Sequence, residues 1–163
     1  MKMKIVEISQ VNDCLAEMVA LFRVELRSYK GIESKPNKDA GREEMEEYLA
    51  AGFPVFAAMV DGEYAGYVVC RVDSEVVWVE SIYVKEEYRR HGVATALHSK
   101  AEEIAASYGE DTVYNYVHPN NHRMIEFLRK RGYTVLNLIE IRKPYQGENM
   151  TQVIHVGEHE FDY

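Results

Sequence analysis

The segment Arg89-Arg90-His91-Gly92-Val93-Ala94 carries the residue types that bind a phosphate group. A strand-like run ends at Val84 and a long helical pattern follows Gly92, so the segment joins a strand to the first turn of a helix. The first N–H groups of a helix have no intrahelical partner and carry partial positive charge, which suits a pyrophosphate. Gly92 lets the backbone approach such an anion, and the arginines add charge beside it. Taken alone, the same stretch is equally consistent with a charged loop before an ordinary helix.

One carboxylate, Glu80, lies inside the apolar run Val76–Val84. Strand alternation predicts that Glu80, Ile82 and Val84 share one face. We interpret Glu80 as a candidate general base, because an alkylammonium group must lose a proton before its nitrogen can attack. The alternatives are an outward-facing strand residue and a structural ion pair.

Three other motifs of catalytic proteins are absent or out of context. The sequence contains neither G-x-x-x-x-G-K-[ST] nor G-x-G-x-x-G, which disfavours a nucleoside triphosphatase and a dinucleotide-binding protein. The string from His155 to His159 matches the H-x-x-E-H pattern of inverted zinc peptidases, but that pattern needs a helix. The neighbouring Val153, Ile154, Val156 and Gly157 disfavour a helix, so we expect no metal site.

Two stretches resemble the signatures of the general-control-type N-acetyltransferase (GNAT) superfamily. The stretch VESIYVKEEYRRHGVATAL resembles the motif in which a strand ends in Val and a loop leads into Arg-x-x-Gly-x-Gly/Ala. The later stretch NHRMIEFLRKRGY resembles the second signature, an Asn, a short helix and a Gly followed by an aromatic residue. The matching positions are Arg89, Gly92 and Ala94 in the first stretch and Asn121, Gly132 and Tyr133 in the second. The resemblance extends over roughly residues 54–141 in element order.

The resemblance implies a fold, a cofactor and a set of cofactor-binding residues. The fold is α/β, with a mostly antiparallel mixed sheet of six to seven strands that splays between its fourth and fifth strands and is flanked by helices. The cofactor is acetyl-coenzyme A, without a metal, lying in the opening. Its pantetheine would follow Ile82, Tyr83 and Val84, Asn121 would lie beside it, and Arg129 could reach the ribose phosphate or adenine. The pyrophosphate loop would comprise Arg89, Arg90, His91, Gly92, Val93, Ala94 and Thr95.

The resemblance also implies a reaction, the direct transfer of an acetyl group to a primary amine of a small molecule or peptide. Some members that acetylate polyamines carry a glutamate at the place of Glu80, where it is thought to act as the base. Many members carry a proton-donating Tyr seven residues after the signature Asn, and here that place is Leu128. Tyr133, Tyr116, His122 or water could replace it. The alternative is a non-catalytic coenzyme A-binding regulatory module of the same fold.

The remaining elements follow from periodicity and turn residues. We expect strands in residues 3–9, 54–60, 64–72, 112–117, 134–141 and 151–156, with a hairpin turn at Asp61-Gly62. Helical spacing begins at Val11 and again at Glu43, and the loop between them, Lys30–Asp39, could shape a substrate pocket. The 163 residues suit a single domain, 1–163. An exposed last strand makes a homodimer possible.

Composition and charge disfavour some classes of partner and some cellular locations. The formal charge of −8 disfavours nucleic acid, and no apolar run is long enough for a membrane span. The short apolar start does not fit a signal peptide, which leads us to expect a cytoplasmic protein without a membrane partner. We expect Cys14 and Cys70 to be small buried residues, because their spacing does not suggest a disulfide framework.

Overall fold

The computed structural model describes all 163 residues, which form two compact units, Met1–His118 and Pro119–Tyr163. The first unit contains the large sheet and three helices, and the second contains one helix and a small hairpin. A single domain over 1–163 stays a prediction.

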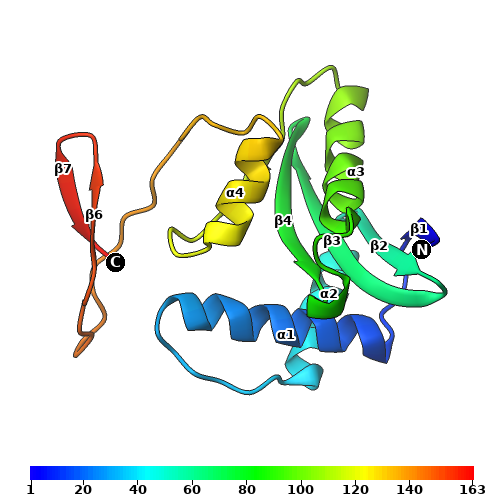
Figure 1. Cartoon of the computed structure of the whole chain (residues 1–163), viewed down its shortest axis with the longest axis horizontal. Helices are drawn as coiled ribbons and strands as arrows, with labels where there is room; N and C mark the ends of the chain where they lie inside the picture. Colours follow the sequence, from blue (N-terminus) through cyan, green and yellow to red (C-terminus); the bar gives the residue numbers. More distant parts are fainter. The chain divides into compact units, whose positions relative to one another are not determined.

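The first unit is built on a five-stranded sheet in which the strands follow chain order, β1-β2-β3-β4-β5. Figure 1 labels the first four of them. The first four strands are antiparallel neighbours, and β5 runs parallel to β4. Asp61 and Gly62 both have positive φ, 50° and 88°, as a two-residue hairpin turn requires, which confirms the hairpin between β2 and β3. The strands are β1 Met3–Glu7, β2 Val55–Val60, β3 Glu63–Asp73, β4 Val76–Val84 and β5 Tyr114–Asn115.

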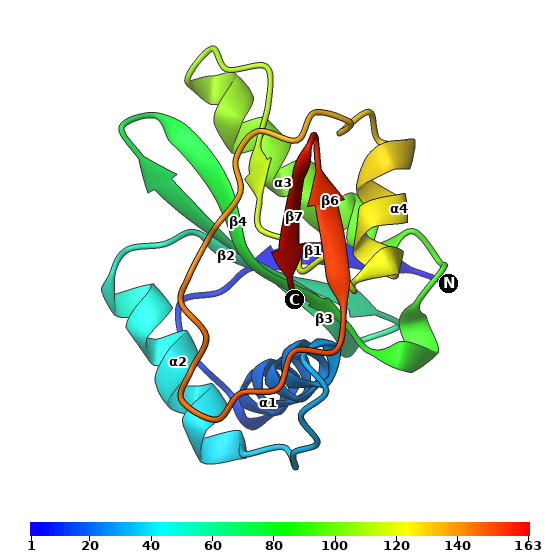
Figure 2. The same cartoon turned by 90° about the vertical axis from the view of Figure 1, so that its left-hand side faces the viewer.

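Helices cover both faces of this sheet. Helices α1 (Asp13–Tyr29) and α2 (Lys38–Ala50) lie on one face, and α3 (Val93–Ser107) lies on the other (Figures 1 and 2). Helix α2 begins five residues earlier than Glu43, because the side chain of Asn37 accepts a hydrogen bond from the Ala40 N–H at 3.1 Å and caps it there. A short 3₁₀ turn, Glu86–Tyr88, separates β4 from the loop before α3.

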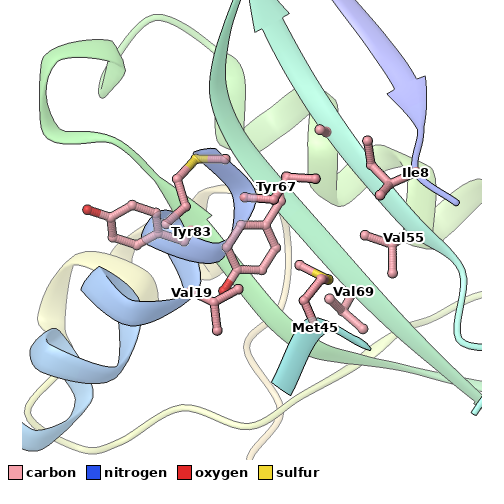
Figure 3. Packing of buried hydrophobic residues seen from close by; sticks show 10 residues of the cluster. Ile8, Val19, Met45, Val55, Tyr67, Val69 and Tyr83 are labelled. Carbon is pink, nitrogen blue, oxygen red and sulfur yellow. The ribbon is translucent and has the colours of Figure 1, made fainter. Parts of the chain in front are cut away.

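The main core lies between the sheet and the α1–α2 pair (Figure 3). Met18 and Val19 of α1 and Met45 of α2 are fully buried there against Tyr67 and Val69 of β3. Each such side chain contributes roughly 1.5–3 kcal/mol through removal of apolar surface from water. The Tyr67 hydroxyl is also buried, but it hydrogen-bonds the Ser81 hydroxyl at 2.8 Å.

The second face has its own apolar contacts, supplied by α3. Val93, Leu97, Ala101 and Ala105 recur every four residues, the spacing of one helix face, and all four are buried. This stripe fixes the start of α3, and therefore the loop before it, against the sheet.

The second unit contains α4 (His122–Lys130) and a hairpin of β6 (Val153–Val156) and β7 (His159–Asp162). Asn121 caps α4 by accepting a hydrogen bond from the Met124 N–H at 3.2 Å, as the sequence predicts. The predicted strand at 134–141 is wrong, because this segment has no ladder partner, and β propensity without pairing does not make a strand. The main sheet therefore has five strands instead of the expected six to seven, while the mixed α/β class is as expected.

Neither cysteine forms a disulfide. Cys70 is buried on β3, and burial raises the pKa of its thiol to about 12. No helix of the protein combines the length and apolar character needed to cross a bilayer.

Candidate active site

The sheet opens along the second half of β4. Strand β5 is much shorter than the expected 112–117 and pairs with β4 only through Trp78–Tyr114 and Val79–Asn115. From Glu80 onward this edge of β4 has no strand neighbour. The fourth and fifth strands therefore part where the resemblance places the cofactor.

The backbone groups of Ile82 and Val84 face this open edge. Lys85 donates its N–H to the Ala65 carbonyl oxygen at 2.9 Å, so Lys85, directly after β4, and Ala65 of β3 form a hydrogen-bonded pair. Because antiparallel pairs alternate, the polar backbone groups of Tyr83 face β3, whereas those of Ile82 and Val84 point away from it. The open edge thus presents the N–H and carbonyl groups of Ile82 and the N–H of Val84 to a ligand, while the Val84 carbonyl oxygen accepts from Arg89 Nε.

The loop between β4 and α3 has the geometry of an anion cradle. Arg90 and Gly92 both have left-handed backbone conformations, with φ of 63° and 81°. Gly92 precedes α3, and no side chain caps this helix. The first bond of the helix runs from the Ala96 N–H to the Gly92 carbonyl oxygen at 3.0 Å, so the N–H groups of residues 93–95 are unpaired. Such a loop and helix start can hold a phosphate through backbone donors alone.

The two arginines of the loop differ in what their side chains do. Arg89 donates from Nε to the Val84 carbonyl oxygen at 2.9 Å and from Nη2 to Glu25 at 2.5 Å, and it lies over the Tyr83 ring. Arg89 therefore anchors the loop to β4 and α1. Arg90 is exposed and has no hydrogen-bond or ion-pair partner, so it is the cation that remains available to an anion.

Glu80 lies at an irregularity in β4 that simple alternation does not predict. Val79 pairs with Cys70 and Ser81 pairs with Val69, so Glu80 is an extra residue without a partner on β3, a β-bulge. The bulge changes which face of the sheet the following side chains point to. Val69 packs in the core under α1 and α2, and Ile82, which pairs with Val68, lies on the opposite face. Glu80 lies on the α1–α2 face, where it contacts Arg71. The expectation that Glu80, Ile82 and Val84 share a face is therefore wrong.

The partner of Glu80 is Arg71 of β3, which was not predicted from the sequence. Arg71 Nε lies 3.1 Å from Glu80 Oε2, and both side chains are more than two-thirds buried. The Arg71 guanidinium also lies 5.2 Å from the centre of the Trp78 ring. The structural ion pair raised as an alternative for Glu80 is thus present. The two-residue turn between β3 and β4, which sets Arg71 opposite Trp78, was the signal that could have found it.

Charged and hydroxyl groups of α2 lie on this same face. Tyr48 donates its hydroxyl hydrogen to Glu44 at 2.9 Å. Burial raises the pKa of Tyr48, and the charge and hydrogen bond of Glu44 and the charge of Glu80 raise it further, so Tyr48 stays protonated at neutral pH. The face that holds Glu80 is therefore lined by fixed polar groups as well as by the core.

An aromatic stack marks the point where β5 leaves β4. Trp78 stacks on Tyr116 with ring centres 4.9 Å apart and contacts Tyr114 at 4.8 Å. Tyr116 is 62 % exposed. Of the residues suggested as proton donors, Tyr116 is the one that shares the first unit with Glu80.

A buried histidine holds β5 against α3. His98 is fully buried on α3, and its Nε2 lies 3.0 Å from Oδ1 of Asn115. Asn115 in turn donates from Nδ2 to the Val113 carbonyl oxygen at 3.2 Å. These contacts fix the short β5 and so help define where the sheet opens. His98 was not among the residues predicted from the sequence.

The other predicted site residues belong to the second unit. The Asn121 side chain caps α4, Arg129 lies in the last turn, and Leu128 is buried. Their roles toward the cofactor stay predictions, as do those of Tyr133 and His122. The H-x-x-E-H string forms the β6–β7 hairpin instead of a helix, and no cluster of three His, Cys, Asp or Glu side chains could hold a metal.

The chain belongs to the acetyltransferase (GNAT) family, whose model matches residues 18–133. An N-alpha-acetyltransferase of Sulfurisphaera tokodaii is 31 % identical over 114 residues, which cover 60 % of this chain and 64 % of the relative. An uncharacterized N-acetyltransferase of Methanocaldococcus jannaschii is 32 % identical over 85 residues, covering 48 % of this chain and 38 % of the relative. The match thus spans less than two thirds of either relative.

Solved structures share the fold. The aminoglycoside N-acetyltransferase AAC(6')-Iy in complex with coenzyme A superposes with a TM-score of 0.65 at 24 % identity, over 87 % of this chain and 95 % of that protein. At this identity the likeness concerns the fold alone.

Proposed function

We propose that the protein is an N-acetyltransferase that moves an acetyl group from acetyl-coenzyme A to a primary amine of a small molecule or peptide. The observation that carries the proposal is the open edge of β4, which runs directly into an uncapped helix start through a loop with two left-handed residues. Family membership and the relative named as an N-alpha-acetyltransferase support the same reaction.

The residues of the first unit fit coenzyme A. The N–H groups of Val93, Ala94 and Thr95 lack partners and would hold the pyrophosphate, with Arg90 beside them. The N–H and carbonyl groups of Ile82 and the N–H of Val84 would bind the pantetheine amides, since the Val84 carbonyl oxygen already accepts from Arg89. When bound, acetyl-coenzyme A supplies an acetyl group activated as a thioester.

Glu80 is the proposed proton acceptor. Arg71 engages Oε2, which leaves Oε1 free to accept a proton from the ammonium group of the acceptor. The bulge directs this carboxylate away from the face of Ile82, to the face of α1 and α2. The acceptor amine would therefore approach from the α1–α2 face.

Tyr116 is the proposed proton donor in place of the Tyr that Leu128 replaces. The residue is exposed, its ring stacks on Trp78, and it lies at the strand end where the sheet opens. A thiolate is a weak base, so a Tyr116→Phe variant should retain part of its turnover with water as the donor.

The direct test is thiol release from acetyl-coenzyme A with a panel of polyamines, amino acids, aminoglycosides and peptides, with mass spectrometry of the products. Thiol release matched by an acetylated amine supports the proposal. Tight coenzyme A binding without transfer to any amine would favour the non-catalytic module. Absence of coenzyme A binding, measured by calorimetry, would contradict both.

A further inference from the structure

A cavity of about 390 Å³ lies between α1, α2 and the loop that joins them. Its polar lining comes from Arg23 and Arg27 of α1, Lys35 and Asn37 of the loop, and Glu44 of α2. The lining thus contains three cationic side chains and one anionic side chain. Its net charge is +2, although the formal charge of the whole protein is −8. We name it the α1–α2 cavity. The sequence suggested that this loop could shape a pocket.

The cations in the cavity are unequally compensated. Arg23 donates from Nε to Glu44 at 2.6 Å, which neutralises its charge and leaves its other nitrogens as donors. Arg27 and Lys35 are exposed and have no hydrogen-bond or ion-pair partner for their side chains. The excess charge therefore resides on Arg27 and Lys35, at the end of α1 and in the loop.

The helices that carry these cations are held closely together. Gly41 of α2 lies so near α1 that a Cβ at this position would be 2.2 Å from the Ala16 carbonyl oxygen. The loop is fixed at its start by the Ile32 N–H, which donates to the Arg27 carbonyl oxygen at 3.0 Å, and at its end by the Asn37 cap. Packing and capping therefore fix the backbone that carries the cavity's side chains.

We propose that the α1–α2 cavity binds a carboxylate or phosphate group. Guanidinium and ammonium groups without counter-ions suit such anions, and the start of α2 adds the favourable end of a helix dipole. The anion is either part of the amine acceptor or a free ligand. The cavity lies on the α1–α2 side of the sheet, and Glu44 in its wall accepts a hydrogen bond from the Tyr48 hydroxyl at 2.9 Å.

Malonate is the probe for the test, titrated into ¹⁵N-labelled protein and followed by amide chemical shifts, with sodium chloride at matched ionic strength as reference. The expected result is a saturable shift of the Asn37, Ala40 and Gly41 amides. The Arg27→Gln/Lys35→Gln variant should weaken it about tenfold or more, since two uncompensated cations are lost. Lys38→Gln is the matched control, because Lys38 is a nearby cation of α2 outside the cavity and should leave the shift unchanged.

Absence of a saturable shift at these amides, or its persistence in the double variant, would overturn the proposal. Shifts at residues 93–95 report the separate loop before α3, so the two sites are read independently in one titration. Acetyl transfer to peptide pairs that differ in Asp against Asn then identifies the source of the anion. A preference for the acidic peptide that the double variant loses assigns the anion to the acceptor, and equal use of both peptides assigns it to a free ligand.

Discussion

Arg71 Nε lies 3.1 Å from Oε2 of Glu80, and the same guanidinium lies over the ring of Trp78. The pair fixes the carboxylate at the bulge of β4 and leaves its second oxygen free. Arg71 is therefore a positioning residue for the proposed base.

Replacement of Arg71 tests this positioning. Arg71→Met keeps much of the side-chain volume but removes the donor, and it should lower kcat about tenfold because Glu80 is no longer held in one orientation. Arg71→Lys restores a cation and should recover part of the loss. The measurement is kcat and acceptor KM for the three proteins. An unchanged kcat in Arg71→Met would show that the pair does not position the base.

Substitutions of the two loop arginines should have different effects, one on stability and the other on coenzyme A binding. Arg89→Gln removes the hydrogen bonds from Arg89 to the Val84 carbonyl oxygen and to Glu25 and should lower the free energy of unfolding by ~1–3 kcal/mol. Arg90→Gln should weaken coenzyme A binding several-fold and leave the free energy of unfolding unchanged, because its side chain has no partner in the protein. Denaturant unfolding and calorimetry measure the two quantities, and the reverse pattern would contradict the assignment.

Any side chain at position 92 should lower the free energy of unfolding, because Gly92 has a left-handed backbone conformation. An Ala Cβ at this position would meet no atom within 4 Å, so only the φ of 81° opposes it. Gly92→Ala should therefore destabilise the protein by ~1–2 kcal/mol and also weaken coenzyme A binding. Gly52→Ala is the control, since Gly52 also has positive φ, 78°, and open space but lies outside the loop. Gly52→Ala should share the loss of stability and keep the affinity.

Alkaline pH should destabilise the fold through Cys70. Its pKa rises from the ordinary 9.0 to about 12 in the folded protein, so the unfolded chain loses this proton first. The contribution is complete below pH 9 and is lost as the pH rises toward 12, by up to ~1.4 kcal/mol per pH unit for one proton. Buried Tyr67, whose pKa is also raised, acts in the same direction at higher pH. Urea unfolding between pH 8 and 11 should show a smaller slope for Cys70→Ala than for the wild type, and equal slopes would contradict this cause.

The sequence predicted the elements whose signals are local. The Asn121 cap, the Asp61-Gly62 turn and the helix after Gly92 depend on residues a few positions apart, and the structure places them as expected. The resemblance likewise located the opening of the sheet.

Features that depend on distant pairing were missed. The bulge at Glu80 arises from the register between β3 and β4, which composition does not encode. The partner of Arg89 on α1, Glu25, is 64 positions away along the chain, so the loop arginine was interpreted as a phosphate ligand and not as an anchor. Residues 134–141 have strand composition without a strand to pair with.

The role of Glu80 as the base is tested by comparing acetyl transfer by the wild type and by Glu80→Gln on the best amine of the panel, with coenzyme A affinity measured alongside. Gln keeps the size of the side chain and removes its ability to accept a proton. If Glu80 is the base, kcat should fall by about 10²–10⁴, the range typical of general base catalysis, with unchanged coenzyme A affinity. Turnover within about twofold of the wild type would contradict Glu80 as the base.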